Sequence, residues 1–315
     1  MAEMQYRKLG PTDLSVSVLG YGASPLGNEF REIDAHEGER AVHMAVDLGV
    51  NFFDTSPYYG RTLSEERLGR FMGHRRQKIV LATKCGRYGL ERFDFSADRV
   101  RASIDESLRR LRTDYVDLLH MHDVEFVDRE QVLHEALPVA RELQRAGKCR
   151  YVGITGLPLG ILRDIAERAP VDAILSYARY NLMADDLDSH LRPSCQELGI
   201  GLINASPLHL GILTERGAPS WHLASADVRR AGQQVADLCR RRGFNVSQVA
   251  LKHCYDYPHT ASVLVGMSQC RHLERNLQAF GLEIPPGLLE EIRETVGEAH
   301  NQLWPSGLPE NQDRP

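Results

Sequence analysis

The sequence predicts an α/β protein, a single-domain (β/α)8 barrel of the TIM type. Short apolar runs of strand length alternate with amphipathic helical patterns, and about eight alternations fit into the 315 residues. The first apolar run ends in GYGASPLG, whose third glycine comes too late for the phosphate-binding turn of a doubly wound sheet. No stretch rich in Pro, Gly or Ser divides the chain, so we expect one domain over residues 1–315.

The expected strands are short, apolar and rich in β-branched residues. They cover residues 16–22, 51–55, 79–85, 115–122, 150–156, 173–177, 199–207 and 262–267. Two helical patterns between them each place four apolar residues on one face: Val100, Ile104, Leu108 and Leu111, and then Leu133, Leu137, Ala140 and Leu143. Ser96 stands at the N-cap position of the first. We expect an irregular tail at about 299–315, with Trp304 packed onto the barrel.

Composition excludes several classes of function. The chain has 38 basic and 43 acidic residues, a net charge of −5, so no overall basic field favours nucleic acid or an anionic membrane. We find no secretory signal and no apolar run near the ~20 residues that span a bilayer. The six cysteines are scattered without a C-x-x-C pair, which predicts reduced thiols, a cytoplasmic location and no metal site.

Polar residues at the ends of successive predicted strands indicate an active site. In (β/α)8 barrels such residues at the carboxyl ends of strands are typically catalytic. Asp54, Lys84 and His122 end the second, third and fourth runs, and Tyr59 follows Asp54 in FFDTSPYYG. Each alone has a plain structural alternative, such as a turn cap, a solvated lysine or a packed aromatic. Together, at three successive strand ends, they favour one catalytic group.

The four side chains suit proton transfer on a carbonyl or carbinol oxygen. A buried Lys84 kept charged by Asp54 would favour the phenolate of Tyr59 and lower its pKa from ~10. His122 would donate a hydrogen bond to the substrate oxygen, whereas His120, on the same strand face, should lie deeper in the barrel. Proton transfer at oxygen accompanies hydride transfer at carbon, which requires a nicotinamide cofactor.

These residues lie in motifs that resemble those of the aldo-keto reductases. FFDTSPYYG, LATKCG, YVDLLHMHD and NASPLHLGIL match that family in order and spacing, within a resemblance from about Tyr6 to Asn276. The resemblance implies a (β/α)8 barrel that binds NAD(P)(H) in an extended form, with a catalytic tetrad of Asp54, Tyr59, Lys84 and His122. It selects Tyr59 over Tyr58, because the family's catalytic phenol directly precedes the glycine.

The resemblance also implies cofactor contacts. They fall on Ala23, Ser24, Asp54, Thr155, Tyr177, Ser206, Leu208, Gly211, Gly266, Met267, Ser268, His272 and Asn276. Thr155, Gly156 and Tyr177 stand where many members hold the carboxamide with Ser-Asn and Gln, and Ala205 stands where many stack an aromatic ring. Tyr177 is the candidate to replace that ring.

The cofactor expected from the same positions is NAD rather than NADP. Gly266, Met267 and His272 stand where NADP-preferring members carry Lys-Ser and an arginine. They offer no charged fork to a 2′-phosphate. Arg271 and Arg275 are the residues that could still supply one.

Further motifs resemble the branch of the family that oxidises aldoses at C1. GASPLG, TKCGRY, FDFSADRVRASIDESL, GITGLP and WPSG are similar to the plant enzymes that convert L-galactose to its 1,4-lactone with NAD. Oxidation of L-fucose or another threo-aldose, a general NADPH-dependent carbonyl reductase and a non-catalytic cofactor-binding subunit remain alternatives. A sugar would contact Tyr58, Tyr59, Arg87, His122 and Asp123.

We expect the protein to be a monomer or weak dimer.

The HMH sequence also resembles the metal ligands of amidohydrolases. It lies on the fourth strand rather than the first, however, and later strands supply no histidine ligands. We therefore expect no metal site.

Overall fold

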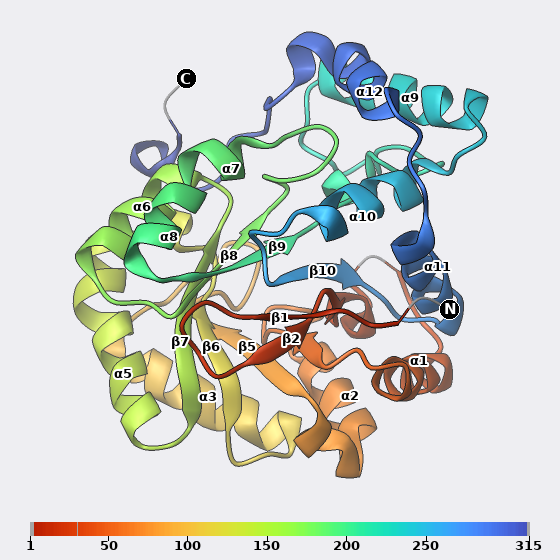
Figure 1. Ribbon diagram of the computed structural model, residues 1–315. Coiled ribbons are helices and arrows are strands. Elements are labelled where there is room, and N and C mark those ends of the chain that lie inside the picture. The colour runs from red at the N-terminus through yellow and green to blue at the C-terminus, as the bar shows by residue number, and fades with distance from the viewer. Residues whose placement is uncertain (1–2, 30, 314–315) are drawn as a thin grey trace.

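The computed structural model describes residues 3–29 and 31–313. Eight parallel strands close into a barrel in the order β10-β3-β4-β5-β6-β7-β8-β9 (Figure 1). The predicted (β/α)8 fold is therefore confirmed, and each strand lies within or near its expected range. The strands are β3 (Leu19–Gly22), β4 (Phe52–Asp54), β5 (Val80–Cys85), β6 (Val116–Met121), β7 (Cys149–Gly156), β8 (Ala173–Tyr177), β9 (Gly201–Ala205) and β10 (Ser262–Gly266).

The first predicted run is in fact two strands. β2 (Ser15–Ser17) pairs antiparallel with β1 (Tyr6–Lys8), and only β3 enters the barrel. This hairpin lies across one end of the barrel (Figure 1), and Leu9 and Leu14 pack into the barrel's interior cluster there. An apolar run of seven residues thus serves two sheets, which periodicity alone does not separate.

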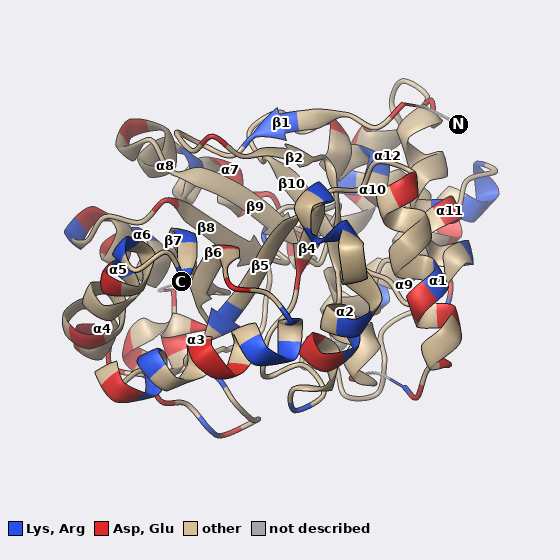
Figure 2. Ribbon diagram, turned by 90° about the horizontal axis from the view of Figure 1, so that it is seen from below, with Lys and Arg blue, Asp and Glu red and all other residues tan. Residues whose placement is uncertain are grey.

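Helices surround the barrel. They include α1 (Ala35–Asp47), α2 (Leu63–Met72), α3 (Ala97–Leu111), α5 (Leu137–Arg145), α6 (Leu159–Arg168), α7 (Asp186–His190), α8 (Arg192–Leu198), α9 (Ala226–Arg241), α10 (Val246–Asp256), α11 (Cys270–Gln278) and α12 (Leu288–Val296). Figure 2 shows acidic and basic residues interspersed along the outer helices. No helix in the described part of the chain is long and apolar enough to cross a membrane.

Both expected helical patterns form helices, with local differences. Ser96 occupies the N-cap of α3, but its side chain makes no capping hydrogen bond; instead its N–H donates to Asp94 Oδ1 at 3.0 Å. The second pattern begins with the short α4 (Arg129–Gln131) and a π-helical turn (Val132–Ala136) before α5. Pro138 has no N–H to donate to the carbonyl four residues earlier, which explains the wider turn.

The residues after α12 run back toward the barrel mouth. Trp304 is buried and lies edge-on to His209 and His222, as expected for a large aromatic residue in this segment. Asp313 accepts hydrogen bonds from the N–H groups of Leu159 and Gly160 at the start of α6, at 3.1 and 2.8 Å. The segment is therefore fixed to the barrel by side chains distant in sequence. All six cysteines are free thiols, and five are buried.

Candidate active site

The four predicted catalytic side chains meet at the carboxyl end of the barrel. Lys84 Nζ lies 2.5 Å from Asp54 Oδ1, 2.8 Å from the Thr55 carbonyl oxygen and 3.2 Å from the Tyr59 hydroxyl. The Tyr59 and His122 rings are edge-on, with centroids 5.7 Å apart. The structure thus places Tyr59, and not Tyr58, beside the lysine.

Close packing of two loops positions Tyr59. The loop after β4 turns back at Pro57, and Gly60 lies against Gly27 in the short helix η1 (Ser24–Gly27). Gly60 has φ +60°, and a β-carbon on it would lie 1.9 Å from the Gly27 carbonyl oxygen. A residue with a side chain fits neither the backbone conformation nor the space. The glycine of the YYG sequence therefore keeps the preceding phenol in the barrel mouth.

The lysine and aspartate form a buried ion pair. Lys84 is 1% exposed, which excludes a solvated lysine at the rim. Burial disfavours the charged ammonium, but Asp54 and Tyr59 outweigh it and raise the pKa of Lys84. Burial also raises the pKa of Asp54, against the opposing charge of Lys84. Two hydrogen-bond acceptors 2.5 and 2.8 Å from Nζ stabilise the charged lysine.

The expected lowering of the Tyr59 pKa is wrong for this structure. Burial raises the pKa of Tyr59 to about 12, although Lys84 acts in the predicted direction and lowers it. Desolvation of a phenolate in an enclosed site exceeds the stabilisation by one lysine, because Asp54 already neutralises much of that charge. Tyr59 is consequently a neutral phenol near neutral pH.

His122 contacts two polar neighbours. Its Nδ1 lies 3.0 Å from the hydroxyl of Ser56, and its Nε2 lies 3.7 Å from Asp123 Oδ2. Burial, and then the charges of Lys84 and Arg87, hold the pKa of His122 well below its usual range. His120 is fully buried within β6 and pairs in register with Lys84. That it lies deeper in the barrel than His122 stays a prediction.

The residues predicted to contact a sugar form one group at the rim. Arg87 forms an ion pair with Asp123, and its guanidinium lies 4.0 Å from the centre of the Tyr58 ring. The N–H of Asp123 donates to Thr155 Oγ1 at 2.9 Å, which links this group to β7. A carboxylate, a guanidinium and a phenol therefore stand beside His122.

The loop after β9 and the helix α11 carry several of the residues predicted to bind the dinucleotide. After β9, positive φ angles occur at Ser206, His209, Leu210 and Gly211. The N–H groups of His209, Gly211 and Ile212 donate to carbonyl oxygens within this loop, which makes the loop compact. Its place at the carboxyl end of β9 is therefore what supports the predicted contacts with the cofactor. Asn276, another predicted cofactor contact, lies in α11 and is buried.

The remaining predicted cofactor residues are spread around the same end of the barrel. Ala23 and Ser24 follow β3, Thr155 and Tyr177 lie at the ends of β7 and β8, and Gly266, Met267 and Ser268 follow from β10 into α11. Met267 is fully buried and belongs to the hydrophobic core.

Two arginines that the sequence analysis did not single out lie near His272. Burial, followed by the charges of Arg31, Arg271, Arg275 and Arg216, lowers the pKa of His272 to about 4. Gln269 Oε1 accepts hydrogen bonds from Arg31 at 3.3 Å and Arg271 at 2.8 Å. Arg31 and Arg216 come from loops distant in sequence, so only the folded chain brings them together.

Glu125 is a third residue that the sequence analysis missed. Its Oε1 accepts from the Leu157 N–H at 3.1 Å, the Ser306 hydroxyl at 2.9 Å and the Tyr177 hydroxyl at 3.4 Å. Oε2 lies 2.8 Å from where a β-carbon on Gly156 would be. Burial, and next the charge of Asp123, raise the pKa of Glu125 to about 8. The sequence did contain one indication of it, because Glu125 follows the predicted catalytic residue His122 by three positions.

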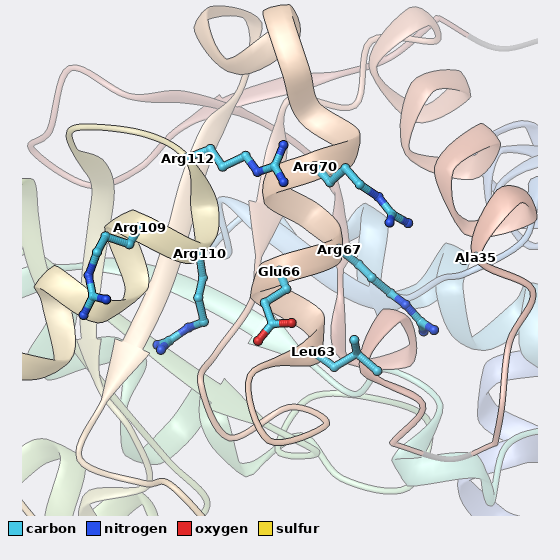
Figure 3. A pocket seen from close by; sticks show the side chains of 8 residues that line it. All are labelled: Ala35, Leu63, Glu66, Arg67, Arg70, Arg109, Arg110 and Arg112. Carbon is cyan, nitrogen blue, oxygen red and sulfur yellow. The ribbon is translucent and has the colours of Figure 1, made fainter.

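A cavity on the flank of the barrel is a poor alternative site. Figure 3 shows five arginines around it, from α2 and the end of α3. Arg110 pairs with Glu65, and Arg67 donates to the Leu26 carbonyl oxygen at 2.6 Å. Arg109 and Arg112 stand at the carboxyl end of α3, where cations interact favourably with the helix dipole. These arginines have structural roles, and the cavity lacks an acid–base pair.

Comparison with known proteins agrees with this geometry. The model of the Aldo/keto reductase family matches residues 18–296. The chain belongs to the aldo/keto reductase family. Among the described residues, no three His, Cys, Asp or Glu side chains are arranged to hold a metal ion.

Several relatives in this family match over nearly their full length. The chain is 43% identical to the L-galactose dehydrogenase of Arabidopsis thaliana, with 99% of this chain and 100% of that protein aligned. It is 30% identical to a D-threo-aldose 1-dehydrogenase of Pseudomonas sp, over 89% of this chain and 94% of that protein. A holo-form aldo-keto reductase from Bacillus halodurans superposes with a TM-score of 0.78 at 25% identity, covering 99% of this chain and 100% of that one.

Proposed function

We propose that this aldo-keto reductase is an NAD-dependent aldose 1-dehydrogenase whose substrate is L-galactose and whose product is L-galactono-1,4-lactone. The observation that carries the proposal is the buried contact of Lys84 with both Asp54 and Tyr59 at the barrel mouth. The identity of 43% with an L-galactose dehydrogenase over nearly the whole chain supports the choice of sugar.

The tetrad residues divide the work on the substrate's C1 hydroxyl. Tyr59, as the phenolate or as a proton relay, accepts the proton from this hydroxyl, and His122 donates a hydrogen bond to the same oxygen. Lys84 favours the phenolate, and Asp54 holds Lys84 in place. The nicotinamide, when bound, supplies the hydride acceptor for C1. Because burial disfavours the phenolate, oxidation should accelerate as pH rises.

Arg87, Asp123 and Tyr58 read the sugar's other hydroxyls in this proposal. Asp123 Oδ2 lies 3.7 Å from His122 Nε2, so in this proposal the carboxylate accepts from a hydroxyl close to C1. The ion pair between Arg87 and Asp123 offers both a donor and an acceptor to such a hydroxyl.

NAD is the proposed cofactor because the positions that hold the 2′-phosphate of NADP in other members lack a lysine or arginine here. Gly266 has no side chain, and the Met267 side chain lies in the core. Gln269 engages Arg31 and Arg271. Use of NADP is the alternative, and the four arginines around His272 favour it. We also propose a cytoplasmic location and a monomer or weak dimer.

Initial rates of NAD and NADP reduction across a panel of L- and D-aldoses test this proposal. We expect the highest kcat/KM for L-galactose with NAD. Equal or better use of NADP would reject the cofactor assignment, and preference for L-fucose or another threo-aldose would reject the sugar. Turnover confined to NADPH-dependent carbonyl reduction would indicate a general reductase, and cofactor binding without turnover would indicate a regulatory subunit.

A further inference from the structure

The geometry points to Ser56 as a positioning residue that fixes His122 in the tautomer with its proton on Nε2. This inference rests on the proposed function, in which His122 donates to the substrate oxygen. Ser56 lies in the loop after β4, between Asp54 at the end of the strand and Tyr59, and it is fully buried. Its hydroxyl oxygen is 3.0 Å from His122 Nδ1.

The His122 ring is neutral, so it carries one N–H and one free lone pair. Burial and the neighbouring charges of Lys84 and Arg87 disfavour the imidazolium form and hold the pKa of His122 well below its usual range. A neutral imidazole is a donor at one nitrogen and an acceptor at the other. The hydrogen bond at Nδ1 therefore decides what Nε2 offers to the substrate.

The hydrogen bonds of Ser56 decide between the two tautomers. Its oxygen already accepts the Tyr58 N–H at 3.0 Å, and among the described residues its other partner is His122 Nδ1. With the proton on Nδ1, this oxygen would accept twice and its own buried O–H would have no acceptor. With the proton on Nε2, the O–H donates to Nδ1, so both the serine hydroxyl and Nδ1 have partners.

The environment of Nε2 favours the same tautomer. Nε2 lies 3.7 Å from Asp123 Oδ2. A lone pair facing a carboxylate is repelled, whereas an N–H in this position is attracted. The serine on one side and the aspartate on the other thus select the same form. His122 Nε2–H is thus a hydrogen-bond donor to the substrate even though the imidazole is neutral.

Long-range ¹H–¹⁵N correlation spectra of ¹⁵N-histidine-labelled protein test the tautomer directly. The His122→Gln variant assigns the signals. We expect Nε2 protonated and Nδ1 unprotonated in the wild-type protein between about pH 6 and 9. In Ser56→Ala, where only Asp123 still favours this form, we expect a mixture of the two tautomers. Protonation of wild-type Nδ1 would overturn the inference, and so would an unchanged tautomer in Ser56→Ala.

Kinetics supply a second readout with a matched control. We expect Ser56→Ala to lower kcat by about tenfold to a hundredfold, as for loss of a residue that orients a catalytic imidazole, with the Kd for NAD unchanged. Ser56→Thr keeps the hydroxyl and should restore both tautomer and rate. Ser262, also a buried serine, donates to the Ser17 carbonyl oxygen at 2.8 Å where β10 begins, so Ser262→Ala should change neither.

The two readouts separate this inference from the proposed function. If no aldose is oxidised but the spectra show the expected tautomer and its loss in Ser56→Ala, Ser56 positions His122 and the proposed substrate is wrong. If aldoses are oxidised and Ser56→Ala loses only thermal stability, the serine is structural and the inference fails.

Discussion

Adjacent phenols in this protein have different partners. Tyr59 contacts Lys84 at 3.2 Å, whereas the Tyr58 ring lies under the Arg87 guanidinium. The difference follows from the turn at Pro57 and Gly60, which directs neighbouring side chains to the catalytic lysine and to the rim. The same sequence stretch thus supplies the proposed acid–base group and a part of the proposed sugar site.

Replacing Tyr59 with phenylalanine tests the acid–base assignment. We expect kcat to fall by at least about 10², the contribution typical of general acid–base catalysis, with the Kd for NAD changed less than about twofold. Tyr58→Phe is the control, because it keeps the ring stacked on Arg87. It should retain kcat and raise only the KM for the sugar, since it loses the hydroxyl proposed to contact the substrate. Stopped-flow and steady-state kinetics measure both. Substantial kcat in Tyr59→Phe would remove Tyr59 from the chemical step.

Glu125 predicts a specific dependence of stability on pH. Its pKa is about 8 in the folded protein against about 4.3 for an unperturbed glutamate, so the folded state binds the proton more tightly. The stabilisation of the folded state by protonated Glu125 is fully present below about pH 4 and is lost as pH rises to about 8. Glu125→Gln stays neutral and should flatten this decline in Tm, whereas the exposed Glu294→Gln should not. A variant with an unchanged Tm–pH profile would contradict the shift.

The contact between α2 and α3 depends on one glycine. A β-carbon on Gly69 would lie 2.2 Å from the Arg110 carbonyl oxygen and 2.7 Å from Leu111 Cα, both backbone atoms. Gly69→Ala must therefore separate the two helices, and we expect a loss of about 1–3 kcal/mol in unfolding free energy. Gly281→Ala is the control, because a β-carbon there meets no atom within 4 Å. Urea unfolding measures the free energy of unfolding of both variants. Equal values for Gly69→Ala and Gly281→Ala would show that α2 and α3 pack less tightly than these distances indicate.

Elements with strong local patterns were predictable, and those that depend on distant partners were not. β8 matches its expected range of 173–177 because a short apolar run bounded by polar residues defines a buried strand. The split of 16–22 into β2 and β3 depends on pairing with β1 and β10. The π-helical turn before α5 arises from Pro138. The spacing of the apolar residues gives no indication of this effect of the proline.

Binding of the cofactor should stabilise the whole molecule. A ligand at ~100 times its Kd adds about 2.7 kcal/mol to the unfolding free energy, which raises Tm by a few degrees. We expect NAD to raise Tm more than NADP at equal concentration, because few free cations stand at the 2′-phosphate positions. Differential scanning fluorimetry measures this without a substrate. A larger shift with NADP would indicate that the arginines around His272 bind the phosphate.

The sequence by itself determined the barrel and the residues at its mouth. Strand-length apolar runs set which faces are buried, and parallel closure brings the strand ends carrying Asp54, Lys84 and His122 together. Only the tertiary structure decided the protonation of Tyr59, the surroundings of His272 and the role of Glu125. A pKa depends on the water excluded by the complete fold and on charges from distant segments, and neither quantity is encoded in local spacing.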